Sequence, residues 1–274
     1  MNMLTLTLKT TPPQGVDVSP LTPENLADLS KAEIGSIALM TGNRRLRVDE
    51  LFEISGDNTK HLVFTGETAL LDYLGKNLSG GQIEVQGPCG AYVGMGMNTG
   101  QIHVRGNSGA FAGCEMGGGL LRIEGNSGDF LGAARPGNKI GMWGGTIIVT
   151  GNVGARAGDH MRRGTLLIEG NAGDYLGSRM LAGTIAVLGK TGIYPGYGMK
   201  RGTLLLWQAP SKLSTTFNDC GYHTLGFLPL MLKSYQSLET RFTNLTKTDR
   251  VHRFCGDMAT LGHGEILIQI QETA

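Results

Sequence analysis

The sequence predicts an all-β fold whose middle part is a parallel β-helix, a solenoid of about seven 19-residue coils between non-repeating ends. Three observations predict it. Glycine supplies 44 of the 274 residues, more than twice its usual share of about 7%. Glycines recur at fixed positions of a repeating unit, and a short apolar strand recurs with them. Regular spacing of this kind is typical of a structural repeat and not of low-complexity sequence.

The repeat unit is easiest to see in GTLLIEGNAGDYLGSRM, which begins at Gly164. Matching segments begin at Gly81, Gly100, Gly119, Gly145, Gly183 and, in truncated form, Gly202. Five of the six spacings are 19 residues, and the unit that begins at Gly119 carries seven extra residues. Counted from its first residue, each of the six full units has glycine at positions 1, 7, 10 and 14, which uses 24 of the 44 glycines.

Each unit contains one short strand, because aliphatic residues occupy positions 3 and 5 and glycines bound them at positions 1 and 7. One such unit cannot bury its apolar face alone, whereas units stacked about 4.8 Å apart can. We expect the glycines to lie at corners, where a positive φ is needed and a side chain would meet the next coil. We expect the asparagines at position 8 to adopt the left-handed conformation of a turn. These are Asn107, Asn126, Asn152 and Asn171.

Four rows of side chains are expected to fill the interior of the stack, and two of them are the aliphatic rows. The third is a methionine row, which we interpret as flexible filling of a stacked core and not as a soft-metal site. Its members are Met97, Met116, Met142, Met161, Met180 and Met199. The fourth is the row at position 12, made of Tyr92, Phe111, Phe130, Arg156, Tyr175 and Tyr194. Arg156 interrupts the aromatic row. Its role is either stacking with the row, or a polar contact or a partner site.

The flanking segments divide the chain into three parts. These are an N-terminal cap at 1–60, the glycine-rich β-helix at 61–207 and a C-terminal cap segment at 208–274. Within the first part we expect a capped helix around Pro23 to Leu29, and residues 62–80 look like a worn first coil. After Trp207 the repeat fails, and we expect a short helix in GFLPLMLKSYQSL and a final strand over His263 to Ile270. Caps are expected because a solenoid must block its open strand edges.

Composition excludes several classes of protein. A formal net charge of +1 gives no bulk basic field for nucleic acid. The four cysteines form no CxxC pair, so neither a disulfide framework nor a zinc or iron–sulfur spacing is present. The N-terminus lacks the pattern of a secretion signal, and no stretch approaches the ~20 apolar residues of a membrane span. We therefore expect a reduced, cytoplasmic protein.

No residue pattern points to catalysis or metal binding. The six histidines show neither i,i+4 nor His-x-His spacing, and His103 fits an exposed charge ladder with Glu84 and Arg122. GxSxG, P-loop and Rossmann patterns are missing. A self-standing β-helix enzyme, such as a polysaccharide lyase or an acyltransferase, would gather polar residues into a cleft, whereas the acidic residues here are spread along the repeat. We expect no catalytic residues and no metal ligands on this chain.

Two features point to contact surfaces. In the later units, position 4 becomes apolar at Ile148, Leu167, Ala186 and Leu205, and either the C-terminal segment or a partner subunit must cover these residues. One corner of the later units collects cations that would suit an acidic ligand tail or an acidic partner. They are Arg162, Arg163, Arg179, Lys200 and Arg201. The seven-residue insertion within Gly132 to Gly144 is expected to project as a loop, and departures from a repeat often mark contact sites.

The unit G-x-[IL]-x-[VI]-x-G-N-x-G-x-[FY]-x-G-x-x-M, over Gly81 to Trp207, resembles a glycine-rich β-helix known from two groups of proteins. One group is the C-terminal domain of the glutamate synthase large subunit. The other is the C subunit of formylmethanofuran dehydrogenase, with its bacterial relative, the C subunit of the formyltransferase/hydrolase complex. A chain of this size with these ends looks like the second group, and the opening TLTLKTTPPQGVDVSPLTPENLADLS looks more like the bacterial form.

The resemblance implies a part in the one-carbon metabolism of methylotrophs, where the bacterial complex serves formaldehyde oxidation. That complex moves a formyl group from formyl-tetrahydromethanopterin to methanofuran and then releases formate. The chemistry belongs to a formyltransferase subunit and to an amidohydrolase-like subunit, and a dehydrogenase-B-like subunit is a further expected partner. Nucleic acid and membranes are not expected partners.

As a C subunit of that family, the chain would be a scaffold without catalytic residues or a cofactor of its own. Methanofuran and tetrahydromethanopterin would serve the complex as a whole. Methanofuran cofactors carry acidic glutamyl tails in this family, and the basic corner would contact such a tail. The alternative within the resemblance is the C subunit of a molybdenum- or tungsten-dependent formylmethanofuran dehydrogenase.

Overall fold

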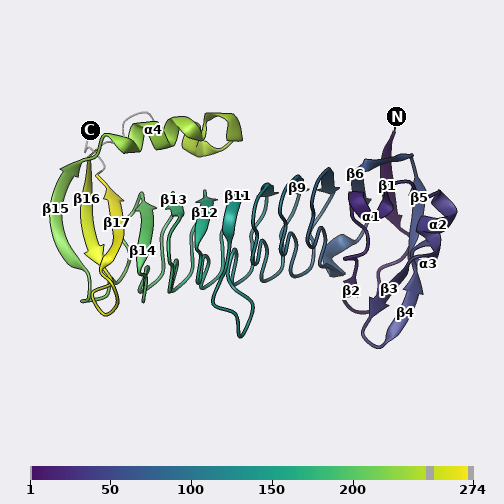
Figure 1. Ribbon diagram of the computed structural model, residues 1–274, viewed down its shortest axis with the longest axis horizontal. Coiled ribbons are helices and arrows are strands. Elements are labelled where there is room, and N and C mark those ends of the chain that lie inside the picture. The colour runs from purple at the N-terminus through teal and green to yellow at the C-terminus, as the bar shows by residue number, and fades with distance from the viewer. Residues whose placement is uncertain (1, 245–249, 271–274) are drawn as a thin grey trace.

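The computed structural model describes residues 2–244 and 250–270, and it is mostly β, with a long, largely parallel sheet of 13 strands (Figure 1). The sheet order is β15-β16-β17-β14-β13-β12-β11-β10-β9-β8-β6-β1-β5. Its strands are β1 (Met3–Leu8), β5 (Phe52–Ser55), β6 (Asn58–Thr65), β8 (Gln82–Val85), β9 (Gln101–Val104), β10 (Leu120–Ile123), β11 (Trp143–Val149), β12 (Arg163–Ile168), β13 (Thr184–Val187), β14 (Arg201–Leu206), β15 (Asn218–Thr224), β16 (Arg250–Gly256) and β17 (His263–Gln269). In Figure 1 these strands form one row along the longest axis of the molecule.

The strands of the repeat units pair in parallel and in register. Ile83 pairs with Ile102, and Ile102 pairs with Leu121, so each position faces the same position of the next unit. The predicted first unit joins the series through β6, in which Leu62 pairs with Ile83. Isolated parallel bridges also link position 9 of successive units, beginning with Cys89 and Ser108. A repeating sequence therefore becomes a set of straight rows of like residues.

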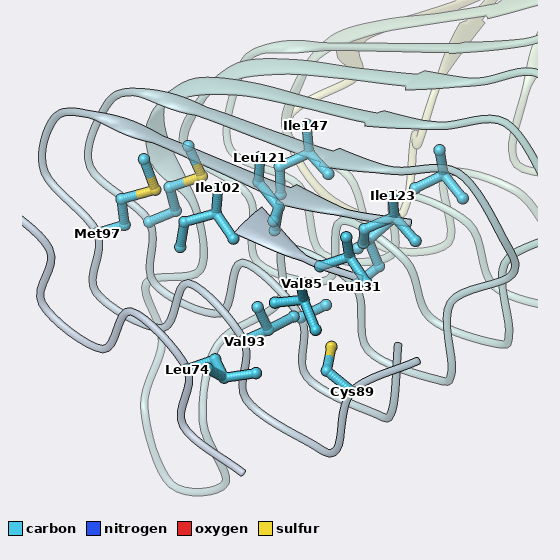
Figure 2. Packing of buried hydrophobic residues seen from close by; sticks show 14 of the residues in the cluster. Leu74, Val85, Cys89, Val93, Met97, Ile102, Leu121, Ile123, Leu131 and Ile147 are labelled. Carbon is cyan, nitrogen blue, oxygen red and sulfur yellow. The ribbon is translucent and has the colours of Figure 1, made fainter. Parts of the chain in front are cut away.

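Three of the predicted interior rows are confirmed. The aliphatic residues at positions 3 and 5 are buried in every unit, and all six repeat methionines are fully buried. Figure 2 shows Met97, Ile102, Leu121 and Ile123 packed in the same core. A further buried row, which the sequence did not reveal, lies at position 13 and includes Val93, Ala112, Leu131, Ala157 and Leu176.

The row at position 12 is not in the interior, so that prediction is wrong. Its residues are half-buried and have left-handed backbones, with φ between 54° and 62°. This conformation turns position 12 outward and gives the interior to position 13. The rings stack along the outside of the turns, where Tyr92 and Phe111 lie 5.0 Å apart and Phe111 and Phe130 lie 4.8 Å apart. Arg156 continues the row by lying over Tyr175, 4.8 Å from the ring centroid.

The asparagines at position 8 are also not left-handed, which corrects a second expectation. Their side chains instead bond the units to one another. The Oδ1 atom of Asn107 accepts a 2.7 Å hydrogen bond from the backbone N–H of Asn126, and Asn126 repeats this contact with Asn152. Because each asparagine satisfies a backbone donor one unit away, the row acts as a ladder across the stack.

The sequence prediction gave every repeat glycine both a positive φ and a close approach to the next unit. The structure confirms the positive φ at two of the four glycine positions. Positions 1 and 14 have positive φ throughout the six full units, as at Gly100 with 86° and Gly113 with 61°. Positions 7 and 10 have ordinary backbones but lie close to the preceding unit. A Cβ on Gly106 would lie 2.6 Å from the backbone N of Pro88. Only glycine fits such an approach without a shift of the backbone.

The two ends of the long sheet differ from the repeat. At the N-terminal end β1 pairs in parallel with β6 and antiparallel with β5. A second sheet of order β4-β3-β2-β7 lies in the same part of the chain and consists of β2 (Val16–Asp17), β3 (Ala38–Thr41), β4 (Arg44–Arg47) and β7 (Leu71–Asp72). Three short α-helices and a 3₁₀ helix accompany it: α1 (Pro23–Leu26), α2 (Lys31–Ser36), α3 (Val48–Leu51) and η1 (Thr68–Leu70). The predicted helix at Pro23 is thus present but ends at Leu26, and it is not capped by a side chain, because Thr22 makes no capping hydrogen bond.

At the C-terminal end the predicted final strand is β17, which pairs in parallel with β14. β16 and β15 then add antiparallel and form the edge of the sheet. The predicted helix is α4 (Phe227–Ser234), followed by η2 (Gln236–Leu238) and η3 (Arg241–Asn244). None of the helices in residues 2–244 and 250–270 has the length and the apolar composition that a membrane-spanning helix needs.

The C-terminal segment covers the apolar residues at position 4, which decides between the two alternatives for that row. Ile148, Leu167, Ala186 and Leu205 are fully buried in one cluster with Leu228 of α4 and further residues of the same segment. In Figure 1, α4 lies alongside the strands of the later units. The apolar outer face of these strands is therefore closed within the chain and is not free for a partner subunit.

Candidate interaction surface

The seven extra residues of the third unit form a projecting loop before β11, as predicted (Figure 1). Glu115 of the preceding unit holds the loop at two points. Its Oε2 accepts a 2.9 Å hydrogen bond from Arg135 Nε, and its Oε1 accepts one of 2.5 Å from Asn138 Nδ2. Burial acts to raise the pKa of Glu115, but the contacts with Arg135 and Asn138 outweigh it and lower the pKa below its usual range.

Two exposed apolar residues lie where the loop meets the sheet: Ile140 in the loop and Trp143 as the first residue of β11. Trp143 is 48% exposed and Ile140 is 43% exposed. The indole of Trp143 lies against Gly117 of the preceding unit, since a Cβ added at Gly117 would lie 2.3 Å from Trp143 Cζ2. Glycine at that position therefore makes the space in which the indole rests.

Two pockets lie beside Trp143 and share it as a wall. One has a volume of about 400 Å³ and is lined by Ile140, Trp143, Arg162 and Arg163. The other has a volume of about 490 Å³ and includes Asn98, Glu115 and Lys139 in its lining, together with Ile140 and Trp143. The exposed Trp143 thus lies between a pocket with a basic wall and a pocket with a mixed polar wall.

Four of the five predicted basic residues lie on one corner of the stack. Backbone hydrogen bonds link this corner from unit to unit: Arg162 N–H donates to Met142 O, and Lys200 N–H donates to Met180 O. Leu181 and Ala182 occupy the unit in between. The exposed pairs Arg162–Arg163 and Lys200–Arg201 are therefore two units apart, or about 10 Å. Within residues 2–244 and 250–270, none of these four cations has an ion pair.

Arg179 does not join them as a free cation, because it pairs with Asp159. Arg179 Nε donates a 2.9 Å hydrogen bond to Asp159 Oδ1, and the same oxygen accepts one of 2.6 Å from the Ser178 hydroxyl. His160 Nδ1 lies 3.3 Å from the other carboxylate oxygen. Burial acts to raise the pKa of Asp159, but these partners outweigh it and hold the pKa below its usual value.

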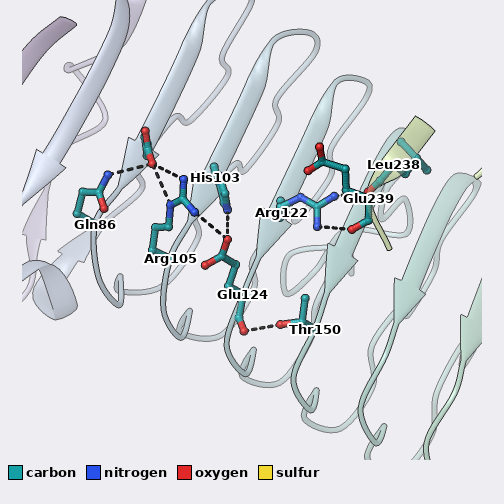
Figure 3. A network of polar contacts seen from close by, with 9 residues as sticks. Gln86, His103, Arg105, Arg122, Glu124, Thr150, Leu238 and Glu239 are labelled. Atoms are coloured by element: carbon teal, nitrogen blue, oxygen red, sulfur yellow. Dashed lines mark hydrogen bonds and ion pairs between the residues drawn. The ribbon is translucent and has the colours of Figure 1, made fainter. Parts of the chain in front are cut away.

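A charge ladder is present around His103 on the outer face of the earlier units, but the partner of His103 is neither Glu84 nor Arg122, which were predicted (Figure 3). His103 Nε2 lies 2.7 Å from Glu124 Oε1, and Arg105 contacts both Glu84 and Glu124 at 2.9 and 3.1 Å. Arg122 leaves the ladder and donates to the carbonyl oxygens of Leu238 and Glu239, as Figure 3 shows. This residue therefore ties the C-terminal segment to the third unit.

The described part of the chain offers few candidate chemical centres. It holds no group of three or more histidine, cysteine, aspartate or glutamate side chains placed to bind a metal ion. Cys89 and Cys114 are buried, and burial raises the pKa of each thiol to about 12. The loop end with Trp143, beside the basic corner, is the feature best suited to bind a partner or ligand.

Sequence reasoning found the insertion and the basic corner but missed Trp143. A signal for it was present. Position 18 of the other units reads Asn98, Gly117, Arg162, Leu181 and Lys200, and an aromatic residue occurs there only in the unit with the insertion. An aromatic residue at an outward-facing turn position is unusual, because it exposes apolar surface without filling the core.

The proteins of known family or structure that this chain matches include a family model, a curated relative and a solved structure. Residues 57–224 match the model of the GXGXG motif family. The C subunit of the formyltransferase/hydrolase complex Fhc of Methylorubrum extorquens is 43% identical over 88 residues, which are 32% of this chain and 33% of that relative. That sequence match thus spans about a third of the curated relative's length.

The third match is to a solved structure. The crystal structure of the formyltransferase/hydrolase complex FhcABCD from Methylorubrum extorquens, in complex with methylofuran, contains a chain that is 40% identical in sequence. The TM-score is 0.92, and the match covers 97% of this chain and 100% of that chain. The likeness therefore includes the flanking segments as well as the repeat.

Proposed function

The chain belongs to the GXGXG motif family and to the family of C subunits of formyltransferase/hydrolase complexes, and we propose that it is the non-catalytic scaffold subunit of such a complex. The observation that carries the proposal is the match over 97% of this chain and the whole of the related chain, at 40% identity. Similarity over this much of both chains supports the same place in the assembly for both.

The reaction we propose for the complex is transfer of a formyl group from formyl-tetrahydromethanopterin to methanofuran, followed by release of formate. A formyltransferase subunit and an amidohydrolase-like subunit would perform the chemistry, with a dehydrogenase-B-like subunit as a further partner. The crystallised relative holds methylofuran, which supports a furan cofactor as the substrate carrier of the complex.

The packing supports the scaffold part of the proposal. We propose that the repeat at 61–207 is a parallel β-helix and that 1–60 and 208–274 close its ends. Each unit is held to the next by paired strands, by the asparagine ladder and by buried aliphatic and methionine rows. A stack fixed by repeated contacts on several sides resists bending, so it would hold catalytic subunits at a constant separation.

The basic corner is proposed as a contact for an acidic group. Arg162, Arg163, Lys200 and Arg201 supply four exposed cations that have no ion pair among the residues the structure describes. Arg179 is not counted with them, because it pairs with Asp159. Two acidic groups fit the family: the glutamyl tail of a methanofuran cofactor and an acidic segment of a partner subunit.

Native purification with mass spectrometry and metal analysis tests the proposed function. We expect the chain to co-purify with a formyltransferase and an amidohydrolase-like subunit, in a complex that converts formyl-tetrahydromethanopterin to formate. Stoichiometric molybdenum or tungsten would assign the chain to a formylmethanofuran dehydrogenase instead. Recovery of the chain without any partner would overturn the scaffold role.

A further inference from the structure

The end of the insertion loop combines apolar and basic surface in a way that the packing of this chain does not use. Trp143 and Ile140 are nearly half exposed, although each is large and apolar. The adjoining pocket of about 400 Å³ is completed by Arg162 and Arg163. Tryptophan and arginine are enriched among the residues that contribute most of the binding energy at protein–protein interfaces.

The geometry of the corner sets the length of chain that it can bind. Trp143, Arg162, Leu181 and Lys200 occupy the same turn position in four successive units, and each backbone N–H donates to the unit before it. Units are about 4.8 Å apart, so the corner extends about 14 Å from Trp143 to Lys200. An extended segment of about five residues spans that length at roughly 3.3 Å per residue.

We propose that this corner is the docking site for an acidic, extended segment of a partner subunit that carries an apolar anchor residue. The anchor packs against Trp143 and Ile140, and its neighbouring carboxylate pairs with Arg162 or Arg163. A second carboxylate, about three residues further along, pairs with Lys200 or Arg201, because the two cation pairs are about 10 Å apart. This inference rests on the proposed function, since it names the kind of partner that binds at the basic corner.

The apolar half of the surface favours a protein segment over a cofactor tail. A glutamyl tail offers carboxylates for the four cations but leaves Trp143 and Ile140 exposed to water. A peptide segment supplies both carboxylates and an apolar side chain, and the two pockets beside Trp143 provide space for such a side chain. Burial of the apolar face of Trp143 then adds to the binding affinity. Ion pairs at an exposed corner add little affinity by themselves.

The test uses the full chain co-expressed with the other subunits of the formyltransferase/hydrolase complex. The first two variants are Trp143→Ala and the double change R162E/R163E, and their matched controls are Leu230→Ala and R44E/R45E, at exposed positions elsewhere. We expect Trp143→Ala to weaken binding of the partner subunit by at least about 30-fold, as at an interface centre. R162E/R163E is expected to weaken it further at low salt, and both controls are expected to bind as the unchanged chain does.

A photo-reactive benzoylphenylalanine in place of Trp143 identifies the occupant directly. Cross-linking to a partner peptide with an apolar residue and two acidic residues supports the inference. Cross-linking to the glutamyl-tailed cofactor or to a second copy overturns it, as does unchanged partner binding by both Trp143→Ala and R162E/R163E. If the unchanged chain assembles with none of the other subunits, the proposed function itself fails, which is a different result from failure of the variants alone.

Discussion

Thr240, in the C-terminal segment, donates a 2.8 Å hydrogen bond from its hydroxyl to the carboxylate of Glu169, which lies 71 residues earlier in the turn after β12. The same carboxylate oxygen accepts a 2.9 Å bond from the backbone N–H of Arg241. Both side chains of the Glu169–Thr240 pair are buried. In the first three units the same repeat position carries an exposed polar side chain (Gln86, Arg105 and Glu124), whereas Glu169 anchors a segment from outside the repeat.

Replacing Glu169 by alanine should loosen that segment. The change leaves the buried Thr240 hydroxyl and the partly buried Arg241 N–H without their acceptor, which costs about 1–3 kcal/mol of the free energy of unfolding. Urea denaturation measures the loss, and hydrogen exchange should show faster exchange in residues 227–243. Glu67→Ala is the matched control, because Glu67 is exposed and no hydrogen bond of its side chain is found in the described structure. Equal stability of the two variants would contradict the anchoring role.

Two leucines of α4 give a paired test of how the segment covers the sheet. Leu228 is fully buried against the position-4 residues, whereas Leu230 is 71% exposed. Leu228→Ala leaves a cavity and should lower the free energy of unfolding by about 2–5 kcal/mol. Leu230→Ala should change it by less than about 0.5 kcal/mol. A similar loss for both variants, measured by denaturant unfolding, would show that α4 does not pack as described.

The regular part of the fold could be predicted because the same residue type is required at the same place in every unit. Ile83 and Ile102 face each other because their units are in register, and the spacing of 19 residues, which five of the six steps share, predicts that register. The rows at position 12 and position 8 could not be placed this way. An aromatic residue suits both a core and a half-exposed stack, so only the left-handed backbone of Tyr92 and Phe111 decides the direction of their rings.

The sequence predicted the basic residues of the surface site but not which of them are paired, and the reason is physical. Arg162 and Arg163 look the same in sequence as Arg179, yet Arg179 is paired. Its partner Asp159 is 20 residues earlier, one unit plus one residue, so the pairing follows only after the turns have been placed against each other. The contact between Glu169 and Thr240 joins the repeat to a segment that does not repeat, and no periodicity could have predicted it.

The close approach of glycines at positions 7 and 10 predicts a large effect from one added carbon. A Cβ on Gly106 would lie 2.6 Å from a backbone nitrogen, and the backbone cannot move without shifting the whole unit. We expect Gly106→Ala to lower the free energy of unfolding by about 1–3 kcal/mol. Gly80→Ala is the control, since nothing lies within 4 Å of its Cβ position and its φ is not positive. Thermal unfolding distinguishes the two, and an equal midpoint for both would refute the packing role.

The Glu115 contacts predict that the insertion loop releases in acid. Because hydrogen bonds lower the pKa of Glu115 in the folded chain, its contribution is complete above the ordinary value of 4.5 and is lost as the pH falls below it. Protonation weakens the bonds from Arg135 and Asn138, so the loop that carries Ile140 should move relative to Trp143. In a Trp207→Phe variant Trp143 is the remaining tryptophan, and its emission should be constant from pH 7 to about 4.5 and change below that.

Glu115→Gln in the same Trp207→Phe background separates this titration from others. Glutamine keeps the size of the side chain but has no carboxyl to protonate, so the emission of Trp143 should lose its transition below pH 4.5. Asp159 also has a lowered pKa and titrates in acid, and Asp159→Asn in the same background provides the comparison. If the transition persists in Glu115→Gln and disappears in Asp159→Asn, the paired carboxylate at Arg179, and not the one at Arg135, controls the surface around Trp143.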